Sequence, residues 1–198
     1  MSKIVAVMGS ANNKGNTAAA VDAILDGAMG LSTNVIRYHN LGKLSAVKAC
    51  DFGDLSARGI AAVPDSDIRS ILEDISSADA VLFATPLHFR FPTPQFTMIL
   101  DCLSCFLSEG KSALAGKKAI VLVTCEKVDT YSNGALDCLV DAIESLGMCV
   151  VSKMIFSTHG GQQQFIENRT AMEKAVKVGA KFSKTFDVEP DSEIILLG

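Results

Sequence analysis

The chain alternates short apolar runs with longer segments in which apolar residues recur every three or four positions. The runs predict β-strands and the periodic segments predict α-helices. The predicted strands cover residues 3–8, 33–38, 80–84, 117–124 and 148–157. The predicted helices cover residues 17–29, 65–78, 94–107, 132–146 and 164–186. Strands and helices therefore alternate along the chain, apart from an irregular stretch at 39–64.

Five strands separated by helices predict a parallel sheet with helices on both faces, in one domain over residues 1–198. Right-handed crossovers favour a doubly wound three-layer α/β/α sheet in the strand order 2-1-3-4-5. Residues 39–64 are then a long loop insertion and residues 187–198 a C-terminal tail. In such sheets, ligands bind beyond the carboxyl ends of the strands, between the first and third strands. This rule selects the loops at 9–16, 85–93 and 125–133.

The composition mainly excludes certain partners and protein classes. The 198 residues are 48% hydrophobic and 20% charged, which is typical of a globular protein. The net charge of −4 and the lack of a basic run favour neither nucleic acid nor a membrane as a partner. The six cysteines lack the spacing of a disulfide scaffold, and the first apolar run is too short for a signal peptide. We therefore expect a cytoplasmic protein.

The first loop has the composition of an anion site. An apolar strand leads through Gly9–Thr17 directly into a helix, whose N-terminus carries a partial positive charge. The dinucleotide pattern G-x-G-x-x-G fails there, because Ala11 and Lys14 occupy its second and third glycine positions. A P-loop ending in Gly110-Lys111-Ser112 also fails, because Cys105 stands at its first glycine.

A loop for a phosphate monoester remains. Ser10, Asn16 and Thr17 offer side-chain donors, and Gly15 allows a tight turn before the helix. The alternative is that Asn16 or Thr17 only caps the helix. The number of hydroxyl and amide side chains in this loop favours the phosphate site.

Two motifs now point to a family. The first is Gly9-Ser10-Ala11-Asn12-Asn13-Lys14-Gly15-Asn16-Thr17, and the second is Ala84-Thr85-Pro86-Leu87-His88-Phe89 after the third strand. With these motifs the chain resembles the flavodoxin-like NADPH-dependent FMN reductase family, which includes iron–sulfur flavoproteins. The resemblance implies a flavodoxin-like fold, bound FMN, NADPH or NADH as electron donor, and a homodimer or homotetramer.

The resemblance also implies a set of cofactor-binding residues. The first loop holds the FMN phosphate, the segment from Pro86 borders the isoalloxazine ring, and the loop after the fourth strand closes over its other edge. His88 and Arg90 have candidate electrostatic roles. The candidate cofactor-binding residues are Ser10, Asn12, Asn13, Lys14, Gly15, Asn16, Thr17, Thr85, Pro86, Leu87, His88, Phe89, Thr124 and Cys125.

The chain departs from the family pattern in three places. The family's proline and arginine after the serine are Ala11 and Asn12 here, so one phosphate-binding charge is missing unless Lys14 replaces it. Where iron–sulfur relatives carry C-x-x-C-x-x-C, this chain has Cys50 alone, and one thiol cannot hold a cluster, so we expect no iron–sulfur centre and no metal. The loop at 124–129 has no glycine.

These observations favour an FMN-dependent oxidoreductase that passes electrons from NAD(P)H to a small acceptor. Quinones, nitro or azo aromatics, free flavin and ferric complexes are the candidate acceptors. The alternatives are an electron-transfer flavodoxin-like protein without its own NAD(P)H activity and a flavin-free scaffold. His159, Gly160 and Gly161 follow the fifth strand at the predicted sheet edge, where a role in a partner subunit's site is an open alternative.

Overall fold

A computed structural model describes residues 2–29, 35–44, 52–108, 111–161, 164–183 and 193–197. Its main feature is a sheet in the order β2-β1-β3-β7-β8-β9, in which all these neighbours pair in parallel. The first five of these strands confirm the predicted order 2-1-3-4-5. The strands are β1 Lys3–Met8, β2 Val35–Asn40, β3 Ala80–His88, β4 Phe91–Pro92, β5 Leu107–Ser108, β6 Lys111–Ser112, β7 Lys118–Cys125, β8 Cys149–Ser157 and β9 Ile195–Leu196.

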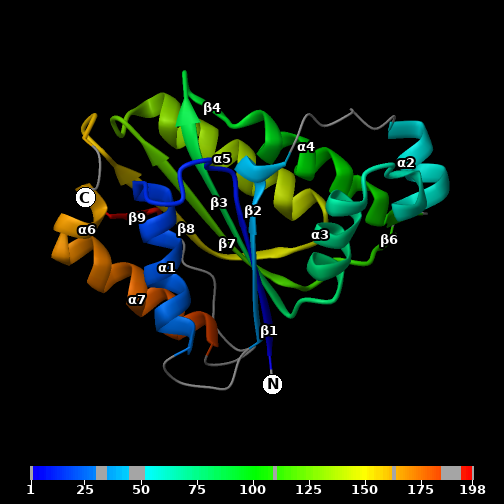
Figure 1. Ribbon diagram of the computed structural model, residues 1–198, viewed down its shortest axis with the longest axis horizontal. Coiled ribbons are helices and arrows are strands. Elements are labelled where there is room, and N and C mark those ends of the chain that lie inside the picture. The colour runs from blue at the N-terminus through cyan, green and yellow to red at the C-terminus, as the bar shows by residue number, and fades with distance from the viewer. Residues whose placement is uncertain are drawn as a thin grey trace.

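Helices cover both faces of the sheet, with α1 and α7 on one side and α3, α4 and α5 on the other (Figure 1). The α-helices are α1 Asn16–Met29, α2 Phe52–Arg58, α3 Ser66–Ser76, α4 Pro94–Leu103, α5 Thr130–Ser145, α6 Gln164–Glu167 and α7 Arg169–Ser183. The described residues also include the short 3-10 helices η1 Leu41–Lys43, η2 Gly59–Ala62 and η3 Ser104–Phe106.

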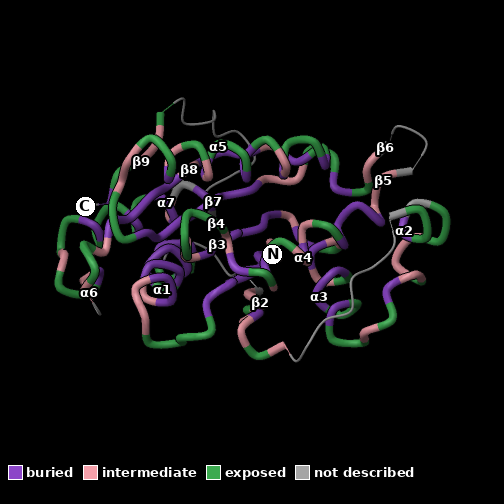
Figure 2. The backbone as a smooth tube through the Cα atoms, turned by 90° about the horizontal axis from the view of Figure 1, so that it is seen from above, coloured by how far each residue is buried: buried purple, intermediate pink, exposed green. Residues whose placement is uncertain are grey.

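The central strands are buried on both faces because their side chains alternate between two hydrophobic clusters. In β1, Val5 and Val7 pack against the α3, α4 and α5 layer, whereas Ile4, Ala6 and Met8 pack against the α1 and α7 layer. Figure 2 shows the buried backbone concentrated in the sheet between the exposed outer turns. This double burial explains why the strands appear as continuous apolar runs in the sequence.

Several predicted boundaries were wrong. The stretch at 39–64 is not irregular throughout, because its described parts form the end of β2, η1, α2 and η2. β3 continues past Pro86 to His88 and turns back into β4. The predicted helix at 164–186 is divided at Asn168, whose side-chain oxygen accepts a hydrogen bond from the Ala171 N–H and so caps α7. Within the predicted tail, β9 pairs with β8.

The α1–α7 crossing requires glycine. A Cβ atom on Gly27 would lie 2.1 Å from the Val176 carbonyl oxygen, and one on Gly179 would lie 1.8 Å from the Ile24 carbonyl oxygen. The two helices therefore meet backbone against backbone.

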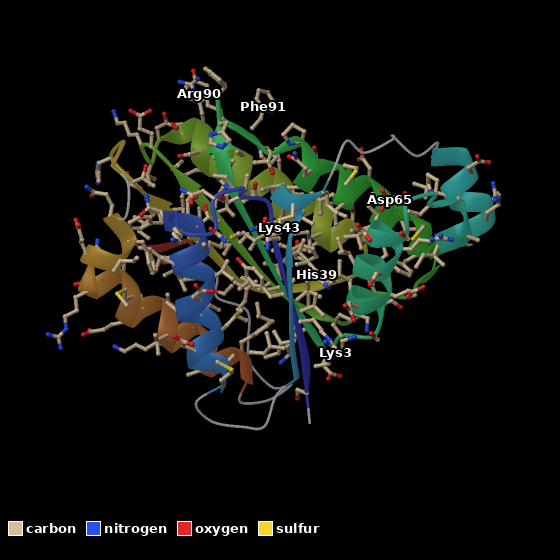
Figure 3. All side chains as sticks on the ribbon, in the orientation of Figure 1. Lys3, His39, Lys43, Asp65, Arg90 and Phe91 are labelled. Carbon is tan, nitrogen blue, oxygen red and sulfur yellow. The ribbon has the colours of Figure 1, made fainter. Side chains whose placement is uncertain are left out.

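A polar cluster joins β1, β2 and α3 beside the sheet. The Asp74 carboxylate accepts hydrogen bonds from Lys3 Nζ at 2.7 Å and His39 Nε2 at 2.9 Å. Desolvation raises the pKa of the Asp74 carboxyl, but the hydrogen bonds and charges of Lys3 and His39 outweigh it and hold the pKa below its usual 3.8. Figure 3 labels Lys3 and His39 in this region.

Candidate functional site

A cleft of about 1020 Å³ opens at the carboxyl ends of β1, β3, β7 and β8. It lies where the strand order reverses between β1 and β3, the usual ligand position in a doubly wound sheet. Loops after all four strands contribute to its walls. The lining residues are Ser10, Ala11, Asn12, Lys14, Gly15, Asn16, Thr17, Pro86, Leu87, His88, Phe89, Arg90, Thr124, Cys125, Glu126, Lys127, Asp129, Ser132, Thr158, Gly160 and Gly161.

The loop after β1 is shaped by its own hydrogen bonds. The Asn12 N–H donates to Ser10 Oγ at 3.2 Å, and the Lys14 N–H donates to Asn12 Oδ1 at 3.0 Å. The loop then leads into α1, which has no acidic residue in its first turn. The first amides of a helix have no partner within it, so this end of the cleft is suited to an anion.

Asn16 links two walls of the cleft. Its Nδ2 donates to the Gly161 carbonyl oxygen at 3.0 Å, and its Oδ1 accepts from the Phe165 N–H at 2.9 Å. These hydrogen bonds of the Asn16 side chain therefore connect the first turn of α1 to the segment after β8, and the side chain also lines the cleft. This function as a connection between loops was not predicted from the sequence.

Two buried hydroxyl groups lie in the floor of the cleft. Thr17 Oγ1 and Thr124 Oγ1 are 2.6 Å apart and form a hydrogen bond in which either can be the donor. Two hydroxyl groups carry two protons, and their mutual bond uses one of them. The pair therefore retains one donor proton, and both residues line the cleft.

The loop after β3 is a tight hairpin rather than an open loop. His88 pairs with Phe91, and the two residues between them, Phe89 and Arg90, have φ values of 51° and 71°. Positive φ at both central residues is the geometry of a type I′ turn. Pro86 to Arg90 all line the cleft.

Buried threonine hydroxyls attach the base of this hairpin to the first loop. Thr93 Oγ1 donates to the Gly9 carbonyl oxygen at 2.9 Å, and the Thr93 N–H donates to Thr85 Oγ1 at 3.3 Å. Thr85 is fully buried and is not among the residues that line the cleft, and its predicted contact with the ligand stays a prediction. The exposed Asn13 also does not contribute to the lining.

The loop after β7 supplies both a thiol and the start of α5. Burial raises the pKa of the Cys125 thiol, and Sγ donates to the Lys127 carbonyl oxygen at 3.2 Å, so this cysteine is a protonated wall residue. Asp129 caps α5 by accepting from the Tyr131 and Ser132 N–H groups. The hydrogen bond from the Ser132 N–H is the main cause that lowers the pKa of the Asp129 carboxyl, and the charge of Arg90 contributes.

The segment after β8 was not assigned to this cleft from the sequence. The Gly161 N–H donates to the Thr158 carbonyl oxygen at 2.7 Å, and His159 and Gly160 between them have φ values of 45° and 77°. This turn brings Thr158, Gly160 and Gly161 into the lining. The glycine pair at the carboxyl end of the fifth predicted strand was the available signal. Because β9 pairs outside β8, this strand is not the sheet edge that was predicted.

Neither a metal cluster nor a membrane helix is found in the described part of the chain. No group of three or more His, Cys, Asp or Glu side chains in these ranges is arranged to hold a metal ion. Cys50 lies outside the described residues, so the expected lack of an iron–sulfur centre stays a prediction. Within the same ranges, no helix is both long and apolar enough to span a membrane.

Comparison with known proteins agrees with this geometry. The fold and the position of the cleft define a flavodoxin-like α/β protein. The sequence matches the NADPH-dependent FMN reductase family over residues 2–163, and the chain belongs to this family. It therefore falls among the FMN-dependent oxidoreductases. A comparison with curated protein sequences found no significant match.

Solved structures share the fold. An apo NADH:FMN oxidoreductase is 22% identical with a TM-score of 0.69, over 98% of this chain and 92% of that one. An FMN-dependent NADH-azoreductase from Bacillus anthracis in complex with FMN is 13% identical with a TM-score of 0.68, over 93% and 100%. A flavodoxin from the domain Archaea is 10% identical with a TM-score of 0.60, over 93% and 98%.

Proposed function

We propose that this chain binds FMN in the cleft and passes electrons from NADPH or NADH to a small acceptor. Quinones, nitro or azo aromatics, free flavin and ferric complexes are the candidate acceptors. The observation that carries the proposal is the cleft itself, which joins an anion-binding helix start to the walls of a larger pocket at the reversal of strand order.

The residues present fit FMN at its phosphate end. The loop from Ser10 to Thr17 surrounds the start of α1, and the Thr17–Thr124 pair retains one hydroxyl donor. Lys14 lines the cleft and can supply the positive charge that the family's arginine would give. We propose that these groups hold the phosphate.

The other end of the cleft fits a planar ring. Pro86 and Leu87 offer apolar surface, and the β3–β4 hairpin and the loop after β7 enclose it from two sides. When bound, FMN supplies the hydride and single-electron chemistry, and the protein supplies position and electrostatics. Arg90 and Lys127 line this wall together with the carboxylates of Glu126 and Asp129, so the two cations are available to an anionic nucleotide donor although the wall carries no net charge.

The comparisons support this function at the level of the class. Family membership supports FMN and a nicotinamide donor, and two of the similar structures are described as an NADH:FMN oxidoreductase and an NADH-azoreductase. The similarity to an archaeal flavodoxin keeps an electron carrier as the second candidate, and the missing arginine keeps a flavin-free scaffold as the third. We also propose a homodimer or homotetramer, which light scattering after size exclusion tests.

The deciding experiment compares FMN with riboflavin, which lacks the phosphate. The purified protein is titrated with each flavin, and NADPH or NADH is then added without oxygen while the visible spectrum is recorded. We expect FMN to bind at least about a hundredfold more tightly, since the phosphate accepts several charge-assisted hydrogen bonds, and its absorbance to bleach promptly. Bound FMN that stays oxidised would indicate a carrier, and a protein that takes up no FMN would overturn both flavin functions.

A further inference from the structure

The β3–β4 hairpin holds two large side chains in an unfavourable backbone conformation at the mouth of the cleft. Phe89 and Arg90 both have positive φ, a region that non-glycine residues avoid. Phe89 is 97% exposed and Phe91 is 72% exposed, so burial of these side chains does not compensate for the unfavourable backbone conformation. Figure 3 shows Arg90 and Phe91 at the end of the molecule opposite Lys3. Strain of this kind concentrates where ligands are held.

The Tyr131 ring, in the first turn of α5, holds the Arg90 side chain. Its guanidinium carbon lies 3.7 Å from the centroid of the Tyr131 ring, and Tyr131 is itself 61% exposed. Because the guanidinium stacks through its face, its N–H groups remain around the edge. In the described parts of the chain, no hydrogen bond or ion pair is found for these N–H groups.

In the described residues, no carboxylate lies within 4 Å of the Arg90 guanidinium as an ion pair. The Asp129 carboxylate interacts with the Arg90 charge from farther away, which contributes to its lowered pKa, and its Oδ1 accepts the two N–H groups that cap α5. An arginine side chain keeps its charge throughout the working pH range. The hairpin therefore presents a permanent cation with unoccupied donors directly beside exposed aromatic rings.

We propose that Arg90, held on Tyr131, selects planar aromatic acceptors that carry an anionic group such as a sulfonate or carboxylate. The aromatic part packs between the exposed ring of Phe89 and the apolar cleft wall. The anionic group accepts two parallel hydrogen bonds from the edge of the guanidinium. This inference rests on the proposed function, because it names the acceptor class for the same cleft.

The test measures binding with two redox-inert probes that share one ring system. Naphthalene-2-sulfonate and neutral 2-naphthol are titrated by calorimetry into the protein, both apo and loaded with FMN, and FMN occupancy is read from the visible spectrum. In the Arg90→Gln variant, we expect the affinity for the sulfonate to fall about tenfold or more, as is usual when a charged hydrogen-bonding partner is lost. The affinity for 2-naphthol should change less than about twofold, since it carries no charge to match.

Two further variants make the test specific. Tyr131→Phe keeps the stacking ring and should keep the preference for the sulfonate, whereas Tyr131→Leu should weaken sulfonate binding a few-fold by releasing the guanidinium. Arg169→Gln removes the same charge from an exposed arginine on α7 and should leave both affinities unchanged. Equal losses for both probes in Arg90→Gln, or a sulfonate effect as large in Arg169→Gln, would overturn the inference. Failure to take up FMN would instead count against the proposed function, since the apo titrations measure Arg90 directly.

Discussion

Replacing Asn16 with alanine separates its structural function from ligand binding. The change removes the hydrogen bonds to the Gly161 carbonyl oxygen and from the Phe165 N–H, which link positions far apart in the sequence. Each bond contributes about 1 kcal/mol net, and an N–H left without a partner in a buried segment costs about 1–3 kcal/mol. Because Phe165 is fully buried, we expect the free energy of unfolding to fall by about 2–3 kcal/mol.

The assay is urea unfolding of the protein without FMN, followed by circular dichroism, with a thermal melt in parallel. For a chain of this size, 1 kcal/mol corresponds to about 2–4 °C, so the melting temperature should fall by roughly 4–12 °C. Measuring without FMN matters, because a bound ligand adds its own stabilisation and would mix the two effects.

Two variants serve as controls for this prediction. Asn12→Ala removes only the hydrogen bond from the Lys14 N–H within the exposed loop, so it should cost less than about 1 kcal/mol. Asn16→Asp keeps the acceptor for the Phe165 N–H but loses the donor to Gly161, and its stability should lie between those of the wild type and Asn16→Ala. An Asn16→Ala protein that unfolds like the wild type would refute the reasoning and leave ligand binding as the only function of this side chain.

Three further predictions concern packing and pH. Gly179→Ala should lower the free energy of unfolding, measured in urea, by at least about 1–3 kcal/mol, because the added Cβ separates α7 from α1. Gly134→Ala, in an open position on α5, should raise this free energy by about 0.5–1 kcal/mol. A Gly179→Ala protein more stable than Gly134→Ala would contradict this. Gly42→Ala should weaken FMN binding about tenfold, because its Cβ would lie 2.1 Å from the Cα atom of Ala11 in the phosphate loop; unchanged affinity in a flavin titration would show that the loop adapts. Because the pKa of the Asp74 carboxyl is lowered in the folded protein, this carboxylate stabilises the fold above the usual pKa of 3.8 and loses that contribution as pH falls through its lower native value. Asp74→Asn should therefore flatten the acid side of a curve of the free energy of unfolding against pH. An unchanged acid side would show that other groups cause the loss of stability there.

The central sheet was predictable because burial on both faces leaves an unmistakable pattern. β1 and β7 are continuous apolar runs, and their positions along the chain, with the rule for right-handed crossovers, determined the order of the first five strands. The two-residue strands β4 and β9 carry no such pattern, since two residues show no periodicity. They exist because longer strands beside them provide unpaired backbone groups.

The candidate site was predictable to the same extent as the sheet. The reversal of strand order selected three of the four loops that line the cleft, and most of the proposed residues lie there. Thr85, also a proposed residue, is outside this lining because its hydroxyl accepts a hydrogen bond from the Thr93 N–H within the core. Gly160 and Gly161 were assigned to the sheet edge because the glycine pair indicates a turn but not its direction, which depends on positive φ at His159 and Gly160.

The connections between loops indicate which part of the cleft is rigid and which part can adapt. Asn16 and Thr17, at the start of α1, form hydrogen bonds to Gly161 after β8 and to Thr124 at the end of β7. Thr93, between β4 and α4, donates to the Gly9 carbonyl oxygen after β1. The partners of Thr17 and Thr93 are buried, so these bonds are protected from water, and the end of the cleft where we propose that the phosphate binds is organised before a ligand arrives. Arg90 is held differently, by an exposed stack on a strained turn that water can compete with. On the proposed function, the chain therefore combines a rigid site for the cofactor with an adjustable contact at the mouth of the cleft, where acceptors would enter and leave.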